Sequence, residues 1–252
     1  MDIESYILGK KASGGGSSDL DWSAIGYTQT PQSIIDGYNY AIYIQNNWDR
    51  TKNFRDDKNI VYMPLLDDIN VTTFSEYFYG CTNLKEMPAL EVNSKNLSYM
   101  FYDCPSLQYV DTSNFDTGET TSMRSMFANC YTIKNIDVSS FNTKKVIDMN
   151  QMFTGCKKLT ELDLSNFETT ALTNIGSMFS GCTSLTKLDV RKFEFNNITT
   201  YNYLFGSSSN SNVPDDCLII VKDDTQKTWI ETNFSRLTNV QTASEYEASL
   251  TN

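Results

Sequence analysis

A block of about 26 residues recurs along this chain, and its most regular mark is a phenylalanine followed three residues later by a cysteine. The cysteines of five successive copies are separated by 23, 26, 26 and 26 residues. The five pairs are Phe78/Cys81, Phe101/Cys104, Phe127/Cys130, Phe153/Cys156 and Phe179/Cys182. Phe205 continues the spacing without a cysteine. A fixed period between about 20 and 50 residues is typical of a solenoid, in which each repeat forms one coil stacked on the last.

The apolar positions inside each repeat predict a β-strand. Leu159, Leu162, Leu164 and Phe167 show the pattern most fully. The equivalent sets are Leu107/Val110/Thr112/Phe115, Ile133/Ile136/Val138/Phe141 and Leu185/Leu188/Val190/Phe193. Leu-x-x-Leu-x-Leu is the strand signature of leucine-rich repeats, in which alternate residues point into the coil. We therefore expect an α/β fold: a leucine-rich-repeat solenoid of about six coils with a parallel sheet.

The segments on either side of the repeats predict an arm, two caps and a tail. Thr30-Pro31 is a helix start signal, and a helix from about Pro31 to Trp48 is expected to cover the first coil. Past the repeats, a strand, a short helix and a last strand are expected to close the stack. The predicted divisions are an N-terminal arm with a Gly/Ser linker (1–20), a helical cap (21–59), the solenoid (60–212), a strand–helix–strand cap (213–242) and a loose tail (243–252).

Composition excludes several classes of function. The chain has no histidine, which removes the commonest general base, and its net charge is −11. A nucleic-acid binder needs a basic surface, so we expect neither an enzyme nor a nucleic-acid-binding protein. No apolar run is long enough to predict a transmembrane segment, and the first residues do not have the pattern of a secretory signal.

An acidic column is the candidate ligand face. Asp111, Asp137, Asp163 and Asp189 share one phase of the repeat, between two inward strand residues, so alternation points them outward. Stacked like charges repel unless they are compensated. Hydrogen bonds to adjacent backbone, a calcium ion or a basic partner are three possible compensations.

The phased cysteines allow a metal, a disulfide or a packing interpretation. Metal sites usually contain Cys-x-x-Cys pairs, and the chain has none. Side chains stacked in parallel keep their Cβ atoms farther apart than a disulfide prefers. We therefore expect buried, reduced thiols, and no metal or other cofactor.

The segments MFTGCKKLTELDLSNFETT and MFSGCTSLTKLDVRKF resemble the 26-residue repeats of the BspA-like leucine-rich repeat family of bacterial surface proteins. The resemblance covers roughly residues 60–242. It implies a non-enzymatic, cell-surface adhesion protein that binds a protein or glycan ligand through a face of the solenoid.

A second, shorter resemblance concerns the first residues. MDIESYILGKKASGGGSS is similar to the attachment arms of some phage and prophage structural proteins. It implies an alternative, in which the arm, through Ile3, Tyr6, Ile7 and Leu8, joins the chain to a virion and the solenoid serves as a receptor-binding tip. The sequence leaves the ligand, the oligomeric state and the choice between cell surface and virion open.

Overall fold

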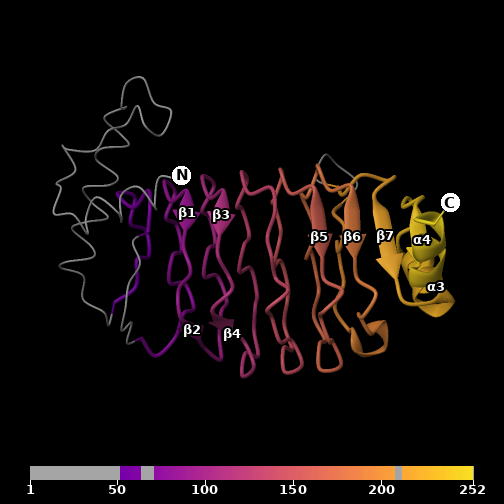
Figure 1. The fold of residues 1–252 in the computed structure, drawn as a ribbon, viewed down its shortest axis with the longest axis horizontal. Coiled ribbons are helices and arrows are strands. Elements are labelled where there is room, and N and C mark those ends of the chain that lie inside the picture. Colours follow the sequence, from indigo (N-terminus) through magenta and orange to yellow (C-terminus); the bar gives the residue numbers. More distant parts are fainter. Residues whose placement is uncertain (1–51, 64–70, 208–211, 252) are drawn as a thin grey trace, which may run out of the picture.

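A computed structural model describes residues 52–63, 71–207 and 212–251 of the 252-residue chain. In these residues the chain winds into a single stack of about seven coils joined by parallel pairing (Figure 1). The predicted solenoid with a parallel sheet is therefore confirmed. The predicted arm and the helix at Pro31–Trp48 lie outside the described residues.

The strands are short, because each coil changes direction after a few extended residues. Two pairs stand at the N-terminal end, and a four-stranded sheet of order β5-β6-β7-β8 closes the C-terminal end. The pairs are β1 (Glu86–Met87) with β3 (Tyr109–Val110), and β2 (Val92–Asn93) with β4 (Phe115–Asp116). The sheet consists of β5 (Glu161–Asp163), β6 (Lys187–Asp189), β7 (Leu218–Val221) and β8 (Val240–Thr242). The register places Asp163 beside Asp189, as a repeat of 26 residues requires.

A column of phenylalanine rings forms the centre of the stack. Neighbouring ring centroids are 5.3–6.2 Å apart and the ring planes lie within 20° of parallel. The seven rings are Phe54, Phe78, Phe101, Phe127, Phe153, Phe179 and Phe205. Stacked aromatic pairs add to the free energy gained from burial, so each repeat stabilises its two neighbours.

The first coil begins earlier than the sequence predicted. Phe54 is buried and stacks on Phe78 at 5.5 Å, although it falls in the range 21–59 assigned to a helical cap. The described part of that range, residues 52–59, contains no helix. The repeat was missed because Asp57 stands where the later copies have cysteine. This coil raises the expected six to about seven.

The predicted strand–helix–strand closes the far end. Helix α3 (Asp224–Asn233) connects β7 to β8, and its N-terminus is capped by Asp223, whose carboxylate accepts hydrogen bonds from the backbone of Thr225 and Gln226. A short 3-10 helix, η3 (Phe195–Asn197), brings Phe195 against Trp229 of α3 with ring centroids 4.4 Å apart. This contact joins the cap to the last repeats.

The predicted loose tail at 243–252 is wrong for its first seven residues, which form helix α4 (Ala243–Ser249). Thr242 and Glu245 form a reciprocal capping box that starts the helix. None of its residues is buried, yet α4 lies against β7 and β8. Ile220 of β7 is outward in the alternation of that strand and is still fully buried, outside the main core. The helix is thus ordered by the apolar strand that it covers.

Candidate functional site

The acidic column lies on the outward face of the coils, which we call the sheet face. Asp111 follows β3, Asp163 and Asp189 end β5 and β6, and Asp137 lies at the equivalent position of a coil segment that forms no strand. Asp137 and Asp163 are exposed and Asp111 is half-buried, whereas Asp189 is only 4% exposed. The structure therefore brings three of the four predicted residues together on an accessible surface. The fourth, Asp189, is buried.

Each carboxylate of the column is compensated by its own backbone. The Oδ1 atom accepts a hydrogen bond from the N–H group two residues later, at 3.0 Å for Asp111, 2.9 Å for Asp137 and 2.8 Å for Asp163. Hydrogen bonds from the Ser139 hydroxyl and backbone lower the pKa of Asp137, because they favour the ionised form. Of the three compensations that the sequence allowed, bonding to adjacent backbone is confirmed.

Asp189 is held differently. Its Oδ1 atom accepts the N–H of Arg191 at 3.1 Å, and the guanidinium of Arg191 also contacts both carboxylate oxygens, with Nη2 at 2.7 Å from Oδ2. The Nη1 atom of Arg191 reaches Glu247 of α4 at 3.0 Å. The prediction that Asp189 belongs to an exposed ligand face is therefore wrong, because Arg191 and α4 cover the end of that face.

Two adjoining grooves run along the sheet face. The larger has a volume of about 480 Å³ and the smaller about 270 Å³, and both are lined by Asn135 and Asp137. Tyr109 lines the larger groove and is 55% exposed. In the part of the chain that the structure describes, no ion pair engages Asp111, Asp137 or Asp163. The sheet face therefore presents unpaired carboxylates beside an accessible aromatic ring.

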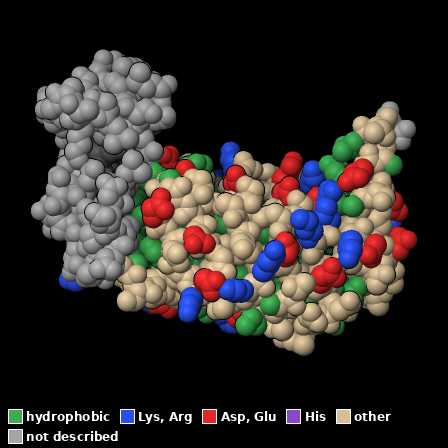
Figure 2. Space-filling model, turned by 60° about the horizontal axis from the view of Figure 1, so that its bottom comes forward, with side chains coloured by type: hydrophobic (Ala, Val, Ile, Leu, Met, Phe, Trp, Pro, Cys, Tyr) green, Lys and Arg blue, Asp and Glu red, His purple; other side chains and the backbone are tan. Residues whose placement is uncertain are grey.

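Three acidic side chains elsewhere on the stack have basic partners. We call the side that carries Glu119, Glu168 and Glu194 the flank. Lys145 pairs with Glu119, Lys144 with Glu168 at 3.4 Å and Lys222 with Glu194 at 3.1 Å. Figure 2 shows basic and acidic side chains interleaved across the surface that it presents. These three flank carboxylates are thus paired with lysines, whereas among the described residues Asp111, Asp137 and Asp163 of the sheet face are in no ion pair.

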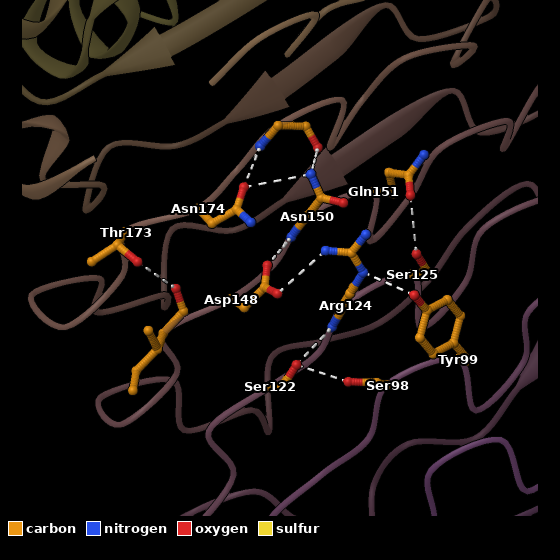
Figure 3. Close-up of polar contacts among 12 residues, drawn as sticks. Ser98, Tyr99, Ser122, Arg124, Ser125, Asp148, Asn150, Gln151, Thr173 and Asn174 are labelled. Atoms are coloured by element: carbon orange, nitrogen blue, oxygen red, sulfur yellow. Dashed lines mark hydrogen bonds and ion pairs between the residues drawn. The ribbon is translucent and has the colours of Figure 1, made fainter. Parts of the chain in front are cut away.

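A polar network missed by sequence reasoning links successive coils (Figure 3). The Nε atom of Arg124 donates to the Tyr99 hydroxyl at 2.8 Å, and Nη1 lies 3.7 Å from Asp148. Asp148 accepts the N–H of Asn150, whose amide donates to the Gly176 carbonyl at 2.9 Å. Each coil supplies a different residue type here, so no column of like residues signalled the network. Its members bond one another, which suits a structural role.

The cysteines are ordinary core residues. All six are buried and unbridged. From Cys81 to Cys182 each thiol lies 2.9–3.3 Å from the carbonyl of a phenylalanine in a preceding coil. Burial raises the pKa of Cys182 to about 12. A thiol that stays protonated is a poor nucleophile and metal ligand, so the predicted packing role is confirmed.

Within the described ranges, no group of three or more acidic or cysteine side chains is arranged to hold a metal ion. Among the same residues, no helix has the length and apolar character needed to cross a membrane. The arm residues Ile3, Tyr6, Ile7 and Leu8 lie outside the described part, so attachment to a virion stays a prediction.

Comparison with known proteins identifies a family for the repeats. Two overlapping segments, residues 46–130 and 95–216, match a family described as Mycoplasma protein of unknown function, DUF285. Together they span more than half of the 252 residues. The chain belongs to this family. No curated protein matches the chain. Membership of the narrower BspA-like group stays a prediction, and the DUF285 family carries no assigned activity to transfer.

Proposed function

We propose that this DUF285 protein is a non-catalytic recognition module that binds a protein or glycan ligand through the sheet face. The observation that carries the proposal is the pair of adjoining grooves along that face, which share Asn135 and Asp137. Stacked coils provide a long continuous surface of this kind, and solenoid proteins commonly use it for binding.

The chemistry of the chain supports binding rather than catalysis. The sequence has no histidine, and the thiols are buried with raised pKa values. On the sheet face, hydrogen bonds from Ser139 lower the pKa of Asp137, which makes this carboxylate a poor general acid at neutral pH. A surface function is supported by the resemblance of the repeats to BspA-like surface proteins, and adhesion is the corresponding role.

A double variant that fills the grooves tests the proposal. Asn135 and Glu161 line the grooves and are exposed, so Asn135→Arg with Glu161→Arg should block the sheet face without disturbing the core. Thr228→Arg with Glu231→Arg makes the same change of charge on the exposed side of α3 and serves as the control. Purified protein is applied to arrays of glycans and of basic peptides.

We expect the groove variant to lose at least about tenfold of the wild-type signal, because two large cationic side chains occupy the binding surface. The control variant should bind like the wild type. Equal binding by the wild type and both variants would place the binding surface elsewhere and refute the proposal.

A further inference from the structure

The lining of the larger groove has the composition of a carbohydrate site. Its volume is about 480 Å³, and apart from Tyr109 and Val110 its lining side chains are hydroxyls, carboxylates and one amide. These are Asp111, Thr112, Ser113, Asn135, Asp137, Ser139 and Ser140. Small polar groups around one large aromatic ring match a ligand that is rich in hydroxyl groups and has an apolar ring face.

Tyr109 supplies the apolar surface. It is the outward residue at the start of β3, and 55% of its surface remains exposed although the ring is large. The C–H groups on one face of a pyranose ring are attracted to the negative face of an aromatic ring, by the same quadrupole that governs other aromatic contacts. An exposed tyrosine at one end of a polar groove suits this stacking.

The polar groups are held in place before any ligand arrives. Because Oδ1 of Asp111 and of Asp137 is bonded to the backbone N–H two residues later, each carboxylate has a fixed orientation. The second oxygen of each carboxylate can accept from a sugar hydroxyl, and the Asn135 amide can both donate and accept. Fixed acceptors reduce the entropy that binding must overcome.

The groove is poorly suited to an extended peptide. Peptides often bind by adding a strand to a free sheet edge. Here the coil is held on both sides, since Asp111 N–H donates to the Met87 carbonyl of the preceding coil at 2.9 Å and the Leu107 carbonyl accepts from the Thr132 hydroxyl of the following coil at 2.8 Å. The following coil therefore occupies the edge to which a peptide strand would have to add. A protein ligand would have to rely on side chains alone.

The charge of the lining selects among glycans. It contains two carboxylates and no lysine or arginine. An anionic sugar would meet like charges in a groove without a compensating cation, and such contacts disfavour a ligand.

We propose that this groove binds a neutral oligosaccharide, with one pyranose ring on Tyr109 and its hydroxyl groups bonded to Asp111, Asn135 and Asp137. The inference rests on the proposed function and narrows it from protein or glycan to an uncharged glycan.

The test uses an array of neutral oligosaccharides of glucose, galactose, N-acetylglucosamine and mannose, with sialylated and sulfated forms of the same chains and a set of basic peptides. The central variant is Tyr109→Asn, which fits the fold because Asn135 occupies the equivalent position one repeat later. Tyr203→Asn is the control, because Tyr203 is 63% exposed, does not line the groove, and has a positive φ that asparagine tolerates.

We expect neutral glycans to bind, their charged forms to bind at least about tenfold more weakly, and Tyr109→Asn alone to lose at least about tenfold in affinity. Absence of neutral-glycan binding, or equal binding by Tyr109→Asn, would overturn the glycan site. If basic peptides bind instead of glycans and the Asn135→Arg/Glu161→Arg variant no longer binds them, the glycan site is refuted and binding through the sheet face is supported. If that double variant still binds every ligand that the wild type binds, both the glycan site and binding through the sheet face are refuted.

Discussion

The phenylalanine column and the aspartate column follow the same 26-residue repeat, one inside the coils and one outside. Inside, identical rings stack at 5.3–6.2 Å and each adds favourable contacts with the next. Outside, identical charges repel, and each carboxylate is stabilised by its own backbone N–H rather than by its neighbour. A residue type that recurs inside the coils therefore indicates packing between coils. An aspartate that recurs outside indicates a local turn and is not by itself evidence of a ligand.

The interior half of this comparison predicts the largest effect. Phe153 is fully buried between Phe127 and Phe179, so Phe153→Ala leaves a cavity and should cost about 3–5 kcal/mol of unfolding free energy. Denaturant unfolding monitored by circular dichroism measures it. Ile147→Ala, at a side chain that is 49% exposed, should change stability by less than about 1 kcal/mol. Equal losses in the two variants would contradict the interior role of the phenylalanine column.

The end of the sheet face offers a second test, because Ile220 of β7 points outward in the strand alternation and is nevertheless fully buried, like an interior residue. Removing residues 243–252 should expose Ile220 and break the contacts of Arg191 with Glu247 and of Lys187 with Tyr246. Exposing one large apolar side chain should cost about 1.5–3 kcal/mol. A truncated protein with unchanged stability would show that α4 does not cover β7.

Buried threonines extend the comparison to polar interior positions. The Thr143 hydroxyl donates to the Glu168 carbonyl of the next coil at 3.0 Å, and Thr143 is 1% exposed. Thr143→Val keeps the shape but leaves that carbonyl without its donor, so a loss of about 1–3 kcal/mol is expected. Thermal melting measures the loss. The matched control is Thr170→Val, because Thr170 is exposed and directly follows Thr169, the residue equivalent to Thr143 one repeat later.

The exterior aspartates should give the smallest effect and a specific dependence on the new side chain. Asp163→Ala removes the acceptor of the Ser165 N–H and should cost about 1 kcal/mol, whereas Asp163→Asn keeps an oxygen in place and should be nearly neutral. If both substitutions are equally neutral, the turn does not need the side chain.

The same column makes a prediction about pH. The pKa of Asp137 is lowered in the folded state, so the ionised carboxylate stabilises the fold above its unfolded pKa. This stabilisation should decline as the pH falls through the folded pKa. In Asp137→Asn the decline should be smaller, which unfolding at pH 7 and at pH 3 can measure; an identical decline in both proteins would contradict the assigned cause.

The sequence alone determined the solenoid, its repeat length, the buried phenylalanines and cysteines, and the closing strand–helix–strand. All of these follow from residues whose type recurs at one phase, because stacked coils place equivalent positions in contact. It did not reveal Phe54, whose repeat lacks the cysteine, or the Arg124 network, whose members differ from coil to coil.

Tertiary structure alone decided which aspartates remain on the surface. Asp163 and Asp189 are equivalent in sequence and adjacent in the sheet, yet one is exposed and the other is covered by Arg191 and α4. The grooves beside Tyr109 and Asn135 were also decided there, because they depend on side chains from neighbouring coils that lie a full repeat apart in the chain. A repeat fixes the phase of a residue, but what covers it depends on contacts between coils and caps.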